Sequence, residues 1–155
     1  GGGVFAQSDQ VTDLGIRTKE IFDGATPSSH AISCRALARL ALCTGDVELL
    51  VVAQRLVDVA ASLIAQHPGA VPDLVDAAGY ALAGVEVVVP GDANNLSNHV
   101  RSMAMPRTVL ITGHGSSVLL ADRRPGLAYV CRSGVCQLPV DSVEALDAQL
   151  RLMIT

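Results

Sequence analysis

The stretch Asp23-Gly24-Ala25-Thr26-Pro27-Ser28-Ser29-His30 separates an irregular N-terminal segment from a long apolar segment. Thr26 is a favourable N-cap residue, and Pro27 would then occupy the first helical position, where its missing N–H is not needed. We therefore expect a helix over about residues 27–43. The sequence Thr44-Gly45-Asp46 marks its end, because glycine readily adopts the left-handed conformation that closes many helices.

The polar residues at the start of this helix form a candidate ligand site. The backbone amides of a first helical turn lack intrahelical partners and favour anions and hydroxyl groups. The candidate ligand-binding residues are Asp23, Thr26, Ser28, Ser29 and His30. The same pattern is also typical of a helix start whose polar side chains serve only as caps. Both interpretations remain open from the sequence.

Apolar residues surround almost the whole of this first helix. From residue 31 to residue 43, the only polar side chains are Ser33, Arg35 and Arg39. A helix that is apolar on most sides needs neighbours on more than one of them. We therefore expect the helix to belong to a larger helical array or to an oligomer.

Two further helices are expected over residues 46–66, with Asp46 as N-cap, and over residues 70–83. The short connection between the first two helices predicts an antiparallel pair. After Gly84 the pattern changes, because Val85-Glu86-Val87-Val88-Val89 is β-branched and nearly all apolar, which predicts a buried strand.

The remaining sequence predicts a compact α/β arrangement. A helix over 94–103 and a strand over 107–112 would follow the buried strand, at a length that fits a parallel crossover. Further elements are expected as a short strand at 118–120, two strands over 127–132 and 135–140, and a final helix over 142–153. The predicted class is mixed α and β, with a helical segment at 1–83 and, at 84–155, a small α/β unit with a partly parallel sheet and a C-terminal hairpin and helix.

Composition and charge narrow the classes of partner. The formal net charge is -4 and there is no basic block, so we expect neither a nucleic-acid partner nor a membrane partner. No apolar run reaches the roughly 20 residues of a membrane span, and no secretory signal is visible. We expect a soluble, cytoplasmic chain with mostly reduced thiols, and no metal or other cofactor.

Cys131 and Cys136 form the most specific local feature. If Ser133-Gly134 is the loop of a hairpin, the two cysteines face each other as a non-hydrogen-bonded pair, with Cα atoms about 4.5 Å apart. Three interpretations compete: two reduced cysteines packed side by side, a reversible cross-strand disulfide, or half of a zinc site that would need a distant ligand such as His114. The pair is therefore a candidate redox pair.

Other polar features are assigned ordinary structural roles. Asp73 and Asp76 share a helix face and are expected to be two solvated carboxylates. His30, His67 and His99 are expected at the surface or at helix caps. The segments Pro90-Gly91-Asp92 and Gly113-His114-Gly115-Ser116-Ser117 are expected to be turns, because neither has a complete phosphate-binding glycine motif.

Several motifs occur in the order found in a known family. They are Gly1-Gly2-Gly3-Val4-Phe5, residues 17–28, Tyr80 ahead of Glu86-Val87-Val88-Val89-Pro90-Gly91-Asp92, Ala128-Tyr129-Val130-Cys131, and Cys136-Gln137-Leu138-Pro139-Val140. Over essentially its whole length the chain resembles the C-terminal region of the thioredoxin-domain-containing family related to spermatogenesis-associated protein 20. It differs where the family pattern has Ser-Gly-Asn-Ser after the proline, because Ser28-Ser29-His30-Ala31 stands there.

The resemblance implies an architecture more than a reaction. It implies a thioredoxin-like domain, then an (α/α)6 toroid similar to N-acylglucosamine 2-epimerases and six-hairpin glycosidases, whose last helices are residues 27–83. The chain would be a non-autonomous C-terminal module without catalysis of its own. Its partner would be the N-terminal part of the same protein or a homo-oligomer, and its ligand carbohydrate-like, consistent with carbohydrate metabolism. The alternatives are a redox-responsive binding module using Cys131 and Cys136, and a sugar-binding, epimerase-like homo-oligomeric enzyme.

Overall fold

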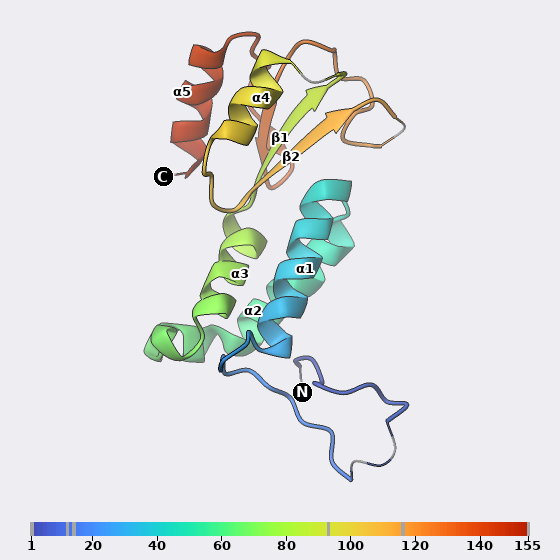
Figure 1. Cartoon of the computed structure of the whole chain (residues 1–155), viewed down its shortest axis with the longest axis vertical. Coiled ribbons are helices and arrows are strands. Elements are labelled where there is room, and N and C mark those ends of the chain that lie inside the picture. The colour runs from blue at the N-terminus through green and yellow to red at the C-terminus, as the bar shows by residue number, and fades with distance from the viewer. Residues whose placement is uncertain (1, 12, 14, 93, 116, 155) are drawn as a thin grey trace. The chain divides into compact units, whose positions relative to one another are not determined.

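The computed structural model describes residues 2–11, 13, 15–92, 94–115 and 117–154. The chain divides into two compact units. The first unit comprises Gly1–Leu40 and Val47–Leu82, and the second comprises Ala41–Asp46 and Ala83–Thr155. Figure 1 shows helices α1, α2 and α3 in the helical part of the chain, and strands with helices α4 and α5 in the part that follows.

The helical unit has the three helices that the sequence predicts, with two changes at their starts. Helix α1 spans Ser29–Thr44 and helix α2 spans Val47–Gln66. A short 3-10 helix at Pro68–Ala70 precedes helix α3 at Pro72–Ala83. The predicted starts at residues 27 and 70 are therefore each two residues early, because a turn or loop precedes the first α-helical residue in both places.

The core of the helical unit is built from small and aliphatic side chains of all three helices. The buried members include Ala31, Cys34 and Ala38 of α1, Ala53, Leu56, Val57 and Ala60 of α2, and Leu74, Ala77, Ala78 and Ala81 of α3. Alanine at so many contact positions lets helices approach closely, since little side-chain volume separates them. The Cys34 thiol also donates to the Ala53 carbonyl oxygen across 3.6 Å.

The second unit is organised around one buried strand. The four strands are β1 at Val85–Pro90, β2 at Thr108–Gly113, β3 at Tyr129–Arg132 and β4 at Val135–Cys136, in the order β2-β1-β3-β4. Strand β1 pairs in parallel with β2 and antiparallel with β3. All six residues of β1 are buried, which is why its sequence is almost continuously apolar.

Two helices pack on one face of this sheet. Helix α4 spans Asn95–Ser102 and helix α5 spans Val143–Ile154. Their side chains share a core with alternate residues of β1, and the buried members include Leu96, Val100, Leu146, Leu150, Val85, Val87 and Val89. Asn94 caps α4 by accepting a hydrogen bond from the backbone N–H of Ser97. Residues 86 and 88 must therefore point to the other face of the sheet.

The mixed α and β class is confirmed, but one predicted strand is wrong. Residues 118–120 form a turn, in which the Leu120 and Ala121 N–H groups donate to the Ser117 carbonyl oxygen at 2.8 and 2.9 Å. The predicted turn that precedes it includes Ser116, which lies outside the described residues. The two predicted C-terminal strands are also shorter than expected, and an isolated bridge between Ala128 and Val140 extends their pairing. Within the described part of the chain, no helix is both long and apolar enough to cross a membrane.

The importance of the helical core can be tested at Leu74, whose side chain is fully buried. We expect Leu74→Ala to lower the free energy of unfolding by about 2–5 kcal/mol, because it removes buried methyl groups and leaves a cavity. The neighbouring Val75→Ala is the matched control, since Val75 is 40% exposed and should change stability by about 0.5 kcal/mol or less. Urea unfolding followed by far-ultraviolet circular dichroism measures both, and equal losses would contradict this description of the core.

Candidate functional site

Ser28 is the N-cap of helix α1. The sequence predicts Thr26 as the cap, and that prediction is wrong. The Ser28 hydroxyl oxygen accepts a hydrogen bond from the Ala31 backbone N–H at 3.2 Å. This is the N-cap to N3 contact that a serine side chain is the right length to make. Thr26 is exposed and lies two residues before the cap. Pro27 therefore precedes the cap, where its fixed φ angle still suits the entering chain.

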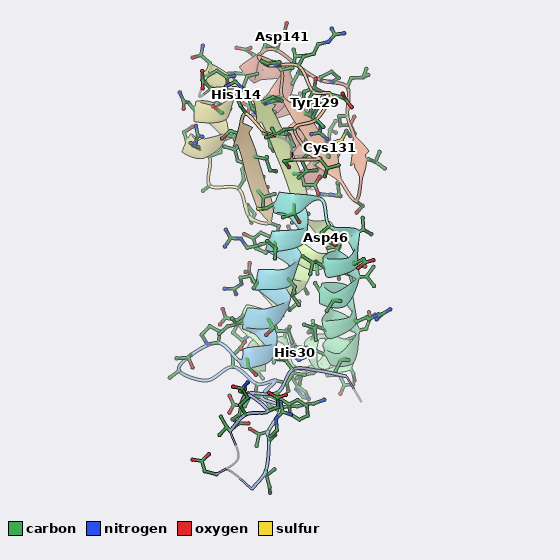
Figure 2. The ribbon with its side chains drawn as sticks, turned by 90° about the vertical axis from the view of Figure 1, so that its right-hand side faces the viewer. His30, Asp46, His114, Tyr129, Cys131 and Asp141 are labelled. Carbon is green, nitrogen blue, oxygen red and sulfur yellow. A yellow bond between two sulfur atoms is a disulfide. The ribbon has the colours of Figure 1, made fainter. Side chains whose placement is uncertain are left out.

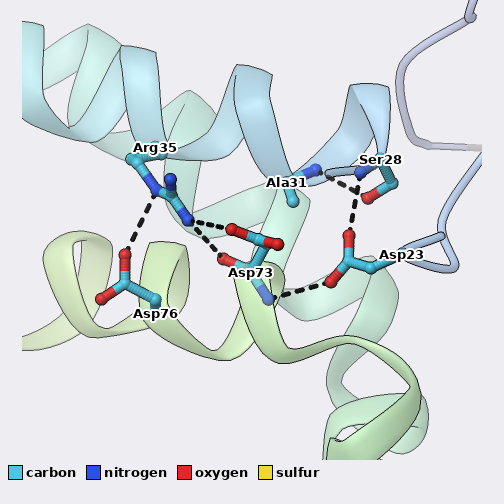
Figure 3. A network of polar contacts seen from close by, with 6 residues as sticks. All are labelled: Asp23, Ser28, Ala31, Arg35, Asp73 and Asp76. Carbon is cyan, nitrogen blue, oxygen red and sulfur yellow. Dashed lines mark hydrogen bonds and ion pairs between the residues drawn. The ribbon is translucent and has the colours of Figure 1, made fainter. Parts of the chain in front are cut away.

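Asp23 connects the starts of two helices. Its carboxylate accepts the Ser28 N–H at 2.8 Å through Oδ1 and the Asp73 N–H at 2.9 Å through Oδ2 (Figure 3). Asp73 is the second residue of α3, and the residue before α3 is Val71, whose side chain has no oxygen to offer. Asp23 thus supplies from the N-terminal segment the cap that α3 cannot supply locally. The Asp23 N–H also donates to the Ala70 carbonyl oxygen at 3.2 Å.

The hydrogen bonds to Asp23 favour its charged form. Partial burial by itself raises the pKa of the Asp23 carboxyl, but hydrogen bonds from the Ser28 and Asp73 backbone amides lower it by more. The net result is a pKa below the ordinary value. The Asp23 carboxylate is therefore an internal structural acceptor that stays ionised near neutral pH.

Arg35 pairs with both carboxylates that were expected to be solvated. Its Nη2 group lies 2.8 Å from Asp73 Oδ1 and also donates to the Asp73 carbonyl oxygen at 3.2 Å. Its Nε group lies 3.2 Å from Asp76 Oδ2 (Figure 3). Asp76 is exposed and Asp73 is partly exposed, as expected of solvated acids, but both carboxylates are also paired with one cation from α1.

His30 is buried, which contradicts the expected surface or cap position. Its side chain is 2% exposed, and its Nε2 group lies 2.8 Å from the Leu56 carbonyl oxygen of α2. The imidazole is thus a polar contact between two helices of the helical unit, where Figure 2 labels it. Ser29 is half-buried, and its hydroxyl donates to the Glu20 carbonyl oxygen at 3.4 Å. The role of these residues in ligand binding stays a prediction.

A disulfide joins Cys131 and Cys136 across strands β3 and β4. The two residues are paired in register, as predicted, and their Cα atoms are 3.9 Å apart. Of the three interpretations left open by the sequence, this structure contains the cross-strand disulfide. His114, the distant zinc ligand considered, instead lies 3.2 Å from Asp92 Oδ1. Cys34 and Cys43 are free thiols, the first buried and the second exposed.

Arg123 lies against both sulfur atoms of this disulfide. Its Nη2 group is 3.6 Å from Cys131 Sγ and 3.4 Å from Cys136 Sγ. The guanidinium carbon is 5.0 Å from the centre of the Tyr129 ring, which makes a cation–π contact. The Tyr129 hydroxyl oxygen accepts the Arg124 backbone N–H at 2.9 Å, which fixes the loop that carries Arg123. Figure 2 labels Tyr129 and Cys131 on β3.

Glu86 is the acidic member of the same cluster. It lies on the central strand β1, directly paired in register with Cys131, and it is only 9% exposed. Burial raises the pKa of the Glu86 carboxyl above its ordinary value, and the positive charge of Arg123 offsets part of this effect. A buried carboxyl, a cation and a disulfide therefore share one side of the sheet, opposite helices α4 and α5.

Among the described residues, no group of three or more His, Cys, Asp and Glu side chains is arranged to hold a metal ion. His99, which was expected at the surface or at a cap, is partly buried and lies 2.7 Å from Asp147 Oδ1, so it connects α4 to α5.

Sequence reasoning missed the partners of the residues it singled out. It did not connect Arg35 with Asp73 or Glu86 with Cys131, because these contacts join segments that are distant in sequence. It also did not place Arg123 against the cysteines, because that contact depends on the course of an irregular loop. One local signal was available for a different contact, the capping of α3 by Asp23. Pro72-Asp73 is a typical helix start, and the apolar Val71 before it indicates that a capping oxygen must come from elsewhere.

The two hydrogen bonds that the Asp23 carboxylate accepts at the starts of α1 and α3 give a pH-dependent prediction. Asp23→Asn should lower the free energy of unfolding by about 1 kcal/mol at pH 7, because an amide can accept only one of the two N–H groups. The folded pKa is lowered, so the stabilisation is present above the unfolded pKa of about 3.9 and is lost as pH falls through the folded value. Urea unfolding at pH 7 and at decreasing acidic pH should show the variant and the wild type converging.

Asp58→Asn, at an exposed position of α2, is the control for this experiment. It should show a difference of less than about 0.5 kcal/mol at either pH. A constant difference between Asp23→Asn and the wild type across the acidic range would contradict the assigned role of the carboxylate.

Comparison with known proteins gives a distant relationship. No protein-family model matches the chain. The chain is 28% identical over 159 residues to spermatogenesis-associated protein 20 of Homo sapiens, which covers 90% of this chain and 20% of that protein. The protein of the same name from Rattus norvegicus gives the same identity and coverage. The chain thus spans about a fifth of the length of these relatives. The resemblance seen in the sequence motifs is confirmed: the chain is a distant relative of spermatogenesis-associated protein 20.

Proposed function

We propose that this chain is a non-autonomous C-terminal module of a longer protein, in which helices α1 to α3 complete the wall of an (α/α)6 toroid. In this proposal the chain has no catalysis of its own, and any activity belongs to the longer protein. The observation that carries the proposal is a second apolar face on helices whose first face is already packed.

Helix α1 has the clearest second face. Ile32, Ala36 and Leu40 follow one another at intervals of four residues, so they lie along one side of the helix. All three are exposed, Ile32 by 54% and Leu40 by 50%. The core side chains Cys34 and Ala38 are fully buried on the other side. This distribution explains why the α1 sequence is apolar almost all round.

Helices α2 and α3 repeat the pattern. Val52 and Val59 are seven residues apart on α2 and are 42% and 48% exposed. Val75 and Leu82 are seven residues apart on α3 and are 40% and 57% exposed. A helix at the surface of a globular protein normally turns charged residues outward. Three neighbouring helices with exposed valine, leucine and isoleucine instead favour a surface that other protein covers.

The covering partner we propose is helical chain that precedes this segment in the same protein. The relatives support it, because the alignment leaves about four-fifths of their length outside the matched region. A helical wall also explains the chemistry of the exposed face, since helix-on-helix packing needs aliphatic side chains at intervals of three, four and seven residues.

A carbohydrate-like ligand remains part of the proposal at the start of α1. Both oxygens of Asp23 already accept a backbone N–H, and the Ser28 hydroxyl caps the helix. A ligand there would meet the remaining lone pairs of the Asp23 carboxylate and the hydroxyl groups of Thr26 and Ser29. His30 would contribute indirectly, by holding α1 against α2.

Whether other protein covers the exposed apolar face of α1 can be tested by thiol labelling of Ile32→Cys in a Cys43→Ser background. Burial raises the pKa of the Cys34 thiol to about 11, and the other two cysteines are paired, so a maleimide reports only on position 32. We expect rapid labelling of the isolated chain. The same variant in the protein translated from the upstream-extended reading frame should label at least about tenfold more slowly, because covering helices exclude the reagent.

The matched control is Ala148→Cys in the same background, since position 148 is exposed on helix α5. Its labelling rate should be equal in the two proteins. Equal rates at position 32 would overturn the proposal, as would an open reading frame that does not extend upstream. Slow labelling of the isolated chain that accelerates on dilution would identify a second copy as the covering partner. Epimerase or hydrolase turnover by the isolated chain would also contradict the proposal.

A further inference from the structure

We propose that the Cys131–Cys136 disulfide is a thiol–disulfide exchange site, in which an external thiolate attacks Cys136 Sγ while Arg123 and Glu86 assist the departure of Cys131. The proposal goes beyond the proposed function, because it gives the second unit a stoichiometric redox reaction, which is distinct from catalysis. It rests on the unequal exposure of the two cysteines and on the charged groups that surround them.

Exposure decides which sulfur is attacked. Cys136 lies in the two-residue edge strand β4 and is exposed, whereas Cys131 on β3 is fully buried. Exchange requires the thiolate to approach one sulfur atom directly, so access selects Cys136 as the electrophile and Cys131 as the leaving group. A disulfide with two buried sulfurs would offer no such path.

Arg123 is placed to stabilise the negative charge that develops. Its Nη2 group is within 3.6 Å of both sulfur atoms, and a neighbouring cation favours thiolate over thiol. Its Nη1 group is buried and has no hydrogen-bond partner among the described residues, so one more donor remains for an incoming anionic group. The Tyr129 ring holds the guanidinium in place.

Glu86 is placed to supply a proton to the leaving sulfur. It is the direct cross-strand neighbour of Cys131 and is almost completely buried. Because burial favours the neutral acid, Glu86 can donate to a buried thiolate that water does not reach. Among the described residues, the other charged or titratable groups at this cluster are Arg123, from the loop between β2 and β3, and Tyr129, from β3.

The step balances with a low-molecular-weight thiol as the reductant. Its thiolate forms a bond to Cys136 Sγ, the Cys131–Cys136 bond breaks, and the electron pair leaves on Cys131 Sγ. The Glu86 carboxyl transfers its proton to that sulfur, which gives the Cys131 thiol and a mixed disulfide at Cys136. A second thiolate then attacks the external sulfur of the mixed disulfide, which releases the small-molecule disulfide and leaves Cys136 as a thiolate. Two thiols are oxidised and one protein disulfide is reduced.

The test uses the full chain with reduced glutathione as the probe, acid quenching and peptide mass spectrometry. The proposal expects the mixed disulfide on Cys136 and not on Cys131. Reduction of Arg123→Gln should be about tenfold slower than that of the wild type, because the leaving thiolate loses its cation. Arg124→Gln is the matched control, since it removes the same charge one residue away, at an exposed position, and should react like the wild type.

A second variant keeps the test decisive if Arg123→Gln fails to fold. Glu86→Gln keeps the shape of the side chain but cannot donate an acidic proton, and it should also slow reduction while its circular dichroism spectrum is unchanged. The proposal is overturned if glutathione attaches mainly to Cys131, if both variants react as fast as Arg124→Gln, or if the purified chain contains four free thiols before any reductant is added.

Discussion

The helical unit depends on how the carboxylate of Asp23 satisfies backbone amides. Every helix begins with N–H groups that have no partner inside the helix. Helix α1 meets this need with Ser28, but α3 is preceded by Val71 and has no oxygen of its own. Asp23 binds an amide at the start of each helix, through one oxygen for each. Arg35 then binds Asp73 from the α1 side, so the first turn of α3 is held by a carboxylate and by a cation.

Much of the fold could be predicted from hydrophobic periodicity and breaker residues. The helices of the helical unit, the buried strand β1 and the crossover to β2 follow from local patterns of apolar residues. The failures occurred where local patterns are short or ambiguous. Val118-Leu119-Leu120 is apolar, but three residues cannot distinguish a strand from a turn, and hydrogen bonds to the Ser117 carbonyl oxygen decide for the turn. The cap of α1 was misplaced by two residues because Thr26 and Ser28 are both good cap residues.

The candidate sites also contain features that the sequence predicts and features that it does not. The facing of Cys131 and Cys136 was predictable, because a two-residue loop fixes the register of a hairpin and strands have a period of two. The positions of Glu86 and Arg123 were not, since they depend on the pairing of β1 with β3 and on the course of a loop. His30 is a similar case. Its burial follows from the packing of α1 on α2, which the sequence does not specify at the level of one side chain.

The two hydrogen bonds of Asp23 span very different lengths of chain, and this has a consequence for the order of assembly. One closes a loop of 5 residues and the other a loop of 50 residues. Loop closure over a short span has the lower entropic cost, so the N-terminal segment and α1 can join before α3 is in place. One oxygen of Asp23 then remains as a ready acceptor for the third helix. If the unit opens in the reverse order, the contact of Asp23 with Asp73 breaks before its contact with Ser28.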